Sequence, residues 1–278
     1  MPQIGQTSIL TVTETSQFGV YLDGDTLGKI LLPNRYVPED LNPGDTIKVF
    51  IHLDSEDRLV ATTEIPKAKV GEFAFLQVSA ISGFGAFLDW GLSKDLLVPF
   101  REQKQKMEEG RSYLVYIYLD DATKRIVASA KIEKFLDNVS PRFSPGEKVD
   151  LMIIGPTDLG YKAIINNTHT GLLYKNETKA ALNPGEQTQG YINRIREDEK
   201  IDLAFEPVGY GAIDDISKQL LTHIRQNNGF LPLTDNSDPE KIREQLGISK
   251  KAFKKAVGSL YKQGKIILEN EGIRLIES

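Results

Sequence analysis

The stretch Gly83-Phe84-Gly85-Ala86-Phe87-Leu88-Asp89 decides the fold, because the chain of 278 residues contains related versions of it on both sides. Phe18-Gly19-Val20-Tyr21 lies 66 residues before Phe84-Gly85-Ala86-Phe87, and Leu159-Gly160-Tyr161-Lys162 lies 75 residues after it. Each copy is preceded, thirteen residues earlier, by a Gly-Gln or Gly-Glu pair that opens an apolar run. A repeat of this length predicts three small domains in series and not one large domain.

Within the second copy, short apolar segments alternate with turn residues. The segments predicted as strands are Phe73–Val78, Gly85–Asp89, Asp95–Pro99, Tyr113–Leu119 and Arg125–Ala130, with a polar stretch at 101–109 that could form a short helix. Strands this short and this regularly spaced are typical of a small closed barrel, in which the sheet edges are hidden.

The two rings of the Phe-Gly-x-Phe pattern have two interpretations. Residues three apart in a regular strand point to opposite faces, but a bulge at the intervening glycine would bring both rings to one face. Two rings on an outer face would form a stacking platform, worth about 1–3 kcal/mol for each stacked base. Alternatively, both rings fill the barrel interior. The spacing alone leaves both interpretations open.

The pattern at 83–89, followed by Leu97-Val98-Pro99, resembles the S1 RNA-binding domain, a five-stranded OB-fold barrel. In that family two aromatic residues and a histidine form the nucleic-acid face, and the histidine follows the second aromatic residue by twelve positions. Twelve positions after Tyr21, Phe87 and Lys162 stand Pro33, Pro99 and Tyr174, so the register is kept while the histidine is missing. The resemblance therefore implies an RNA-binding barrel with an altered set of contacts.

The residues expected to contact RNA are aromatic or basic. The rings are Phe18, Tyr21, Phe84, Phe87, Trp90, Phe100 and Tyr174, and the cations of the barrels are Lys94, Arg101, Arg125, Lys162, Arg194 and Arg196. Arg194 and Arg196 are two positions apart on a predicted strand and would share a face. The alternative for each cation is a solvated surface side chain without a ligand.

The last seventy residues follow a helical pattern. Pro207–Gly211 is expected to be a linker, and three helices follow, with Asp238 and Ser249 as N-caps and Gly247 and Gly264 as stops. In the third helix Phe253, Ala256, Val257, Leu260 and Tyr261 form an apolar stripe, and the basic residues lie mostly opposite: Lys250, Lys251, Lys254, Lys255 and Lys262. A hairpin at 266–276 completes a pattern that resembles a winged-helix domain. Backbone contact with nucleic acid, contact with protein, and a solvated lysine face all remain open.

Composition limits the alternatives. The chain has no cysteine, which excludes disulfides and thiol catalysis. The net charge of −5 is uneven: residues 1–66 carry −6, and residues 67–142 carry +2. The acidic clusters fall at hairpin turns, and the three histidines lack metal-ligand spacing, so we expect neither an enzyme nor a cofactor. No signal peptide or membrane-spanning run is evident, which favours a cytoplasmic protein without a membrane partner.

The expected fold class is mostly β: three tandem S1-type OB-fold β-barrels at 1–65, 66–140 and 141–208, followed by a small α+β winged-helix domain at 211–278. This order resembles the conserved virulence factor B (CvfB-like) family of bacteria. The resemblance implies a non-catalytic regulator of gene expression that binds single-stranded RNA. A duplex-DNA-binding transcription regulator and an adaptor for ribosome or polymerase are the alternatives.

Overall fold

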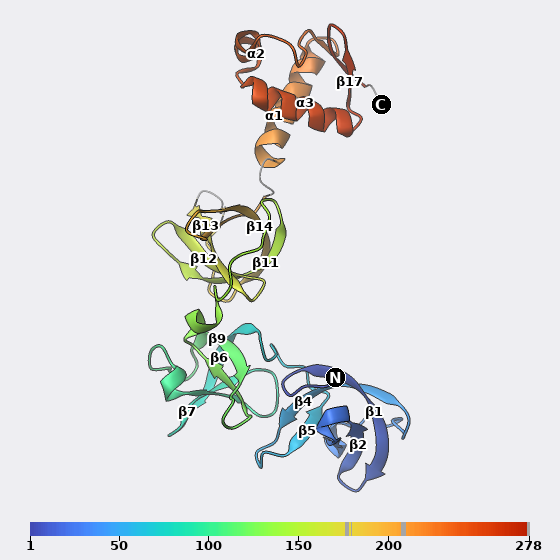
Figure 1. Ribbon diagram of the computed structural model, residues 1–278, viewed down its shortest axis with the longest axis vertical. Helices are drawn as coiled ribbons and strands as arrows, with labels where there is room; N and C mark the ends of the chain where they lie inside the picture. Colours follow the sequence, from blue (N-terminus) through green and yellow to red (C-terminus); the bar gives the residue numbers. More distant parts are fainter. Residues whose placement is uncertain (176–177, 179, 207–209, 277–278) are drawn as a thin grey trace. The chain divides into compact units, whose positions relative to one another are not determined.

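The computed structural model describes residues 1–175, 178, 180–206 and 210–276 (Figure 1). The chain divides into two compact units. The first comprises Met1–Arg142, Asp150–Thr188 and Glu197–Ile201, and the second comprises Phe143–Val149, Gln189–Arg196 and Asp202–Ser278. The start of the linker predicted at Pro207–Gly211, residues 207–209, lies outside the described residues. No helix in the described part of the chain is long and apolar enough to cross a bilayer.

The first barrel closes in the strand order β1-β2-β3-β5-β4. Its strands are β1 (Thr7–Ser16), β2 (Gly19–Asp23), β3 (Lys29–Pro33), β4 (Thr46–Leu53) and β5 (Leu59–Thr62). Alternate residues point inward, as a strand period of two requires. Val20 and Leu22 of β2 are therefore buried in the barrel core, and Tyr21 between them is half-buried on the outer face.

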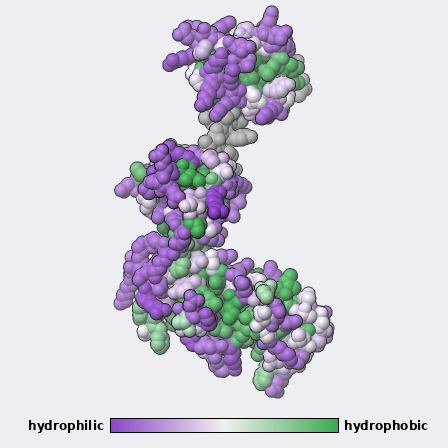
Figure 2. Space-filling model, in the orientation of Figure 1, coloured by the Kyte–Doolittle hydropathy of each residue, from purple (hydrophilic) through white to green (hydrophobic). Residues whose placement is uncertain are grey.

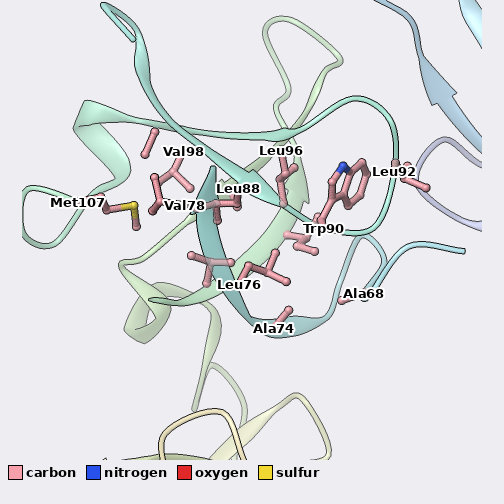
Figure 3. Close-up of a cluster of buried hydrophobic side chains, with 14 of the residues drawn as sticks. Ala68, Ala74, Leu76, Val78, Leu88, Trp90, Leu92, Leu96, Val98 and Met107 are labelled. Carbon is pink, nitrogen blue, oxygen red and sulfur yellow. The ribbon is translucent and has the colours of Figure 1, made fainter. Parts of the chain in front are cut away.

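The second barrel repeats this arrangement, with the closed order β10-β8-β7-β6-β9. Its strands are β6 (Phe73–Ile81), β7 (Gly85–Asp89), β8 (Leu96–Pro99), β9 (Ser112–Leu119) and β10 (Ile126–Ser129). Leu76, Val78, Leu88 and Val98 pack in its core (Figure 3). The short helix expected at 101–109 is wrong: only Phe100–Glu102 forms a 3₁₀ turn, because Gln103 already has an extended backbone.

The third barrel follows the strand order of the first, β11-β12-β13-β15-β14. Its strands are β11 (Lys148–Pro156), β12 (Gly160–Ile165), β13 (His169–Tyr174), β14 (Gln187–Ile195) and β15 (Ile201–Ala204). The three closed barrels and the winged-helix domain confirm the predicted fold class. The individual domain boundaries expected from the sequence stay predictions.

The glycine of each repeat is required by a close backbone approach. A Cβ atom added to Gly19, Gly85 or Gly160 would lie 2.0, 2.2 or 1.9 Å from the carbonyl oxygen of Leu32, Val98 or Leu173 on the next strand. Gly19 and Gly85 also have φ angles of 146° and 156°, which residues with a side chain rarely adopt.

The bulge that would bring both rings to one face does not lie at this glycine. The register shifts instead occur on the preceding strands, between Val12 and Glu14, between Val78 and Ala80, and between Ile153 and Gly155. The extra residue lies beside the second ring position of the repeat. In the first two barrels its hydroxyl donates to that residue's carbonyl, Thr13 to Tyr21 and Ser79 to Phe87, both at 3.1 Å.

The C-terminal domain contains α1 (Tyr210–Gln226), α2 (Pro239–Leu246) and α3 (Lys250–Lys262), with a sheet of order β16-β18-β17. The sheet strands are β16 (Phe230–Leu231), β17 (Ile266–Glu269) and β18 (Gly272–Leu275). The Asp238 side chain accepts from the Glu240 amide at 2.8 Å, and the Ser249 hydroxyl accepts from the Ala252 amide at 3.3 Å, so both predicted N-caps are confirmed. Phe253, Ala256 and Leu260 of α3 are buried against Leu220 and Ile224 of α1.

Replacing Gly85 with alanine is expected to destabilise the second barrel by roughly 1–3 kcal/mol, because the new Cβ meets a carbonyl and the φ angle is disfavoured. The measurement is urea unfolding followed by the fluorescence of Trp90, the single tryptophan, which lies in that barrel's core. Gly83→Ala is the control, since nothing lies within 4 Å of its added Cβ. Equal unfolding midpoints for the two variants would contradict the role given to Gly85.

Candidate nucleic-acid interface

The first ring of each pair lies at the surface. Phe18 is 62% exposed and Phe84 is 78% exposed, while Tyr21 and Phe87 are half-buried on the outer face. The alternative that these rings fill the barrel interior is therefore excluded for Phe18 and Phe84. In the third barrel Leu159, 61% exposed, takes the place of the first ring, and Lys162 is half-buried.

A hydroxyl two residues before the first ring position shapes the turn in all three barrels. The Phe18 amide donates to Ser16 Oγ at 3.2 Å, and the Phe84 amide donates to Ser82 Oγ at 3.1 Å. In the third barrel Thr157 Oγ1 contacts the backbone of Gly160. The sequence analysis missed these residues, although a Ser or Thr at the same register of every repeat is a signal that could have revealed them.

The positions that replace the S1 histidine lie across from the glycine. Gly19 pairs with Pro33, Gly85 with Pro99, and Gly160 with Tyr174. The same spacing therefore leads to the same place in each barrel. Tyr174 is half-buried there, whereas a proline offers no side-chain hydrogen bond to a base.

A pocket of about 270 Å³ lies beside the rings of the second barrel, within the first compact unit. The second barrel contributes Phe84, Phe87, Leu97 and Arg125 to its lining, together with Lys94 from the loop before β8. The first barrel contributes His52 and Leu53, from the end of β4. Because Phe87 pairs with Leu97 in the register of β7 and β8, this lining continues the outer face of the barrel.

Two cations border this pocket, and both have partners in the first barrel. Arg125 donates from Nε to Asp57 Oδ1 at 2.7 Å and from Nη2 to Asp57 Oδ2, and these hydrogen bonds lower the pKa of the Asp57 carboxyl. Lys94 Nζ donates to the carbonyls of Leu53 at 3.1 Å and Asp54 at 2.8 Å. Burial, followed by the positive charge of Arg125, lowers the pKa of Lys94.

His52 lines this pocket, although the sequence analysis did not assign it to a binding surface. Its side chain is buried, and burial lowers its pKa, so the imidazole is neutral at neutral pH. Nδ1 lies 3.2 Å from the carbonyl oxygen of Leu53. No sequence pattern identifies it, because its position beside Phe84 and Phe87 depends on how two barrels pack together.

Trp90 does not fit the role expected from the sequence. It is only 3% exposed and belongs to the core cluster, where it lies toward Leu92 and Leu96 (Figure 3). Its indole N–H donates to the Lys94 carbonyl at 2.6 Å, and its ring lies edge-on to Phe50 of the first barrel at 5.6 Å. An indole that is buried to this extent cannot stack on a base at the surface, so its predicted role as a stacking ring is corrected to a core role.

The remaining basic candidates of the barrels are mostly engaged in ion pairs. Arg101 is exposed and lies 3.6 Å from Asp120. Arg194 and Arg196 do share a face, but both donate to the buried carboxylate of Asp202, from Arg194 Nε at 2.6 Å and from Arg196 Nε at 3.0 Å. These two guanidinium groups are thus held by an internal partner that the sequence did not indicate.

The lysines of α3 form the basic surface of the winged-helix domain. Lys251, Lys254, Lys255 and Lys262 are exposed, and Lys250 is half-buried. Lys254 lies 3.7 Å from Asp235. Much of the visible surface of this domain is hydrophilic (Figure 2). Tyr261, predicted to lie in the apolar stripe, is 55% exposed, because it is at the edge of the face that packs on α1.

The described residues contain no group of three or more histidine, aspartate or glutamate side chains that could hold a metal ion. Beside the surface rings lie apolar side chains, cations and the carboxylates that pair with them. Such a surface can stack planar groups and neutralise phosphates.

Closed barrels with surface rings, followed by a winged helix, define a protein of the nucleic-acid-binding class. The S1 domain family matches residues 4–64 and 70–131, and the CvfB-like winged helix domain matches residues 218–275. The uncharacterized protein YitL of Bacillus subtilis (strain 168) is 31% identical over 96% of this chain and 91% of the relative. The chain belongs to the CvfB-like family.

Two further similarities have lower identity. Conserved virulence factor B of Staphylococcus aureus (strain N315) is 27% identical over 86% of this chain and 85% of the relative. A solved structure from Streptococcus pneumoniae TIGR4, described as a multidomain protein with nucleic acid binding domains, covers 98% of both chains at 22% identity with a TM-score of 0.40.

The carboxylate of Asp202, 1% exposed, is expected to stabilise the end of the third barrel. Burial alone would raise its pKa, but hydrogen bonds from Arg196 and Arg194 outweigh burial and lower it. Asp202→Asn should therefore lower the free energy of opening of β15 by about 1.5–3 kcal/mol at neutral pH. Amide hydrogen exchange of Ile201–Ala204, read by mass spectrometry, measures this.

Because the folded pKa of Asp202 is depressed, its contribution is complete above the unfolded value of about 4 and is lost as the pH falls below it. As the pH falls below about 4, the free energies of β15 opening in the wild type and in Asp202→Asn should therefore become more alike. Asp198→Asn is the control, since Asp198 pairs with Lys200 in an exposed position and should change exchange little. An equal effect of both substitutions, or a difference that persists at low pH, would refute the role of Asp202.

Proposed function

We propose that this protein binds single-stranded RNA without catalysis and acts as a regulator of gene expression at the RNA level. The observation that carries the proposal is the repeated pair of surface rings, Phe18 with Tyr21 and Phe84 with Phe87, at the same place on two closed barrels. Every base has a flat face, so such rings bind unpaired nucleotides with little regard to sequence.

The charge distribution supports the second barrel as the principal RNA contact. Residues 67–142 carry a net +2, although the whole chain carries −5. Exposed Arg101 follows Phe100 in the sequence, and exposed Lys94 lines the same pocket as Phe84; both would hold phosphates beside stacked bases. The third barrel, with Leu159, Lys162 and Tyr174 in place of the usual rings, would contribute weaker contacts.

The winged-helix domain favours a second phosphate contact. The exposed lysines of α3 suit phosphates better than base edges, since an ammonium is a compact charge without the fork geometry that reads a base pair. A duplex-DNA regulator is the alternative function, because this helix enters the major groove in DNA-binding members of the class. The exposed Tyr261, Ile267 and Leu268 favour an adaptor function through protein contacts instead.

The double variant Phe84→Ala with Phe87→Ala is expected to weaken binding of single-stranded RNA by roughly 2–6 kcal/mol, if one base stacks on each ring. Fluorescence anisotropy with labelled oligoribonucleotides measures the affinity. Ile9→Ala removes a side chain of β1 that is 71% exposed and serves as the control. A change within experimental error would refute stacking at these rings, and a preference for duplex DNA in competition would refute the RNA proposal.

Lys251→Glu with Lys255→Glu should weaken RNA binding and flatten its salt dependence. If each lysine neutralises one phosphate, the slope of log affinity against log salt should decrease in magnitude by about 1.4. Lys241→Glu with Arg243→Glu on α2 makes the same change in total charge and is the control. An equal effect of the two double variants would mean that net charge, and not the surface of α3, determines the affinity.

A further inference from the structure

The pocket beside Phe84 and Phe87 is built from two barrels. His52 and Leu53 of the first barrel face the same space of about 270 Å³ as the rings of the second barrel. Pockets for drug-sized ligands measure about 300–1,000 Å³, so this one suits a smaller planar group. Its lining is mainly apolar, with the cations Lys94 and Arg125 and the carboxylate of Asp95.

We propose that this composite pocket binds one unstacked nucleobase, with His52 of the first barrel taking the place of the histidine that the second barrel lacks. This inference rests on the proposed function and deepens it. Phe84 and Phe87 line the cavity with aromatic surface, and His52 adds a polar atom to the same cavity.

The imidazole can act as a hydrogen-bond acceptor. A carbonyl oxygen only accepts, so the contact between Nδ1 and the Leu53 carbonyl places the ring proton on Nδ1. The neutral ring then has an acceptor lone pair on Nε2, for which the described residues provide no hydrogen-bond donor. The N–H groups of a base's pairing edge match this acceptor, and only an unpaired base has them available.

The two cations retain donors for a phosphate. An ammonium has three N–H groups, and Lys94 uses two of them on the carbonyls of Leu53 and Asp54. A guanidinium has five, and Arg125 uses two on Asp57. The same contacts tie the two barrels together, so the groups that build the pocket also place N–H donors at its border.

A simple packing defect between two barrels explains the site less well. The ring of Phe84 is 78% exposed although it lines the cavity, so apolar surface that packing could have covered remains available to a ligand. The joint itself is well packed elsewhere, since Phe50 of the first barrel belongs to the core cluster of the second.

Trp90 lines the pocket and is the single tryptophan of the chain, so its fluorescence reports on occupancy. Titration with single-stranded oligoribonucleotides should change the Trp90 emission in a saturable way. An oligomer of the same length that carries abasic ribose phosphates should not change it. Anisotropy measured in parallel with labelled RNA reports on total binding, independently of the pocket.

His52→Phe keeps an aromatic ring beside Phe50 and removes the acceptor, and it should weaken RNA binding roughly three- to tenfold. His223→Phe, in the winged-helix domain, is the matched control and should leave the affinity unchanged. Urea unfolding of both variants shows whether either loses stability. His52→Gln, which restores a polar side chain with an acceptor oxygen, should recover part of the loss and separates hydrogen bonding from packing.

The outcomes separate the two proposals. RNA binding that depends on Phe84 and Phe87, with unchanged Trp90 emission and an inert His52→Phe, would overturn the pocket and leave the RNA proposal standing. Absence of RNA binding in anisotropy would overturn the proposed function, while titration with the four ribonucleoside monophosphates would still test the pocket through Trp90. A monophosphate that binds as tightly as the oligomer would support the base pocket and assign it to free nucleotides.

Discussion

The organisation of this protein depends on one backbone contact, which is repeated in each barrel. At Gly19, Gly85 and Gly160 the neighbouring strand lies so close that its carbonyl oxygen occupies the space of a side chain. The residue before the glycine therefore lies on a turn, and its side chain is at the surface. A serine or threonine hydroxyl hydrogen-bonds to the backbone of this turn in each barrel. The constraint that closes the barrel thus also exposes the ring.

The second level of organisation is the joint between the first two barrels. Phe50 packs with Trp90, Arg125 pairs with Asp57, and Lys94 donates to two carbonyls of the first barrel. These contacts occupy two N–H donors of Lys94 and two of Arg125 and leave their other donors available. They also create a concave surface that neither barrel has alone, since the pocket is lined by both.

Predictions from the sequence were accurate where a local pattern carries the information. Alternation and turn residues predicted the barrels, and the capping residues Asp238 and Ser249 predicted the ends of two helices. Predictions failed where a residue type has more than one physical use. Trp90 is aromatic like Phe84, but its large indole packs in the barrel core. Its N–H donates to the Lys94 carbonyl there. The polar stretch at 101–109 had helical composition, but only a 3₁₀ turn formed.

By itself, the sequence determined the repeat, the ring positions and the order of domains, because strand period, glycine spacing and helix caps act over a few residues. Only the tertiary structure decided which charges are engaged and where a cavity lies. Arg194 and Arg196 donate to Asp202, and His52 lines the same cavity as Phe84 and Phe87 of another barrel; no spacing in the chain encodes either arrangement. The pairing of β14 with β15 sets the first arrangement, and packing between two barrels sets the second, since burial makes each polar group take the partner that the folded chain places beside it.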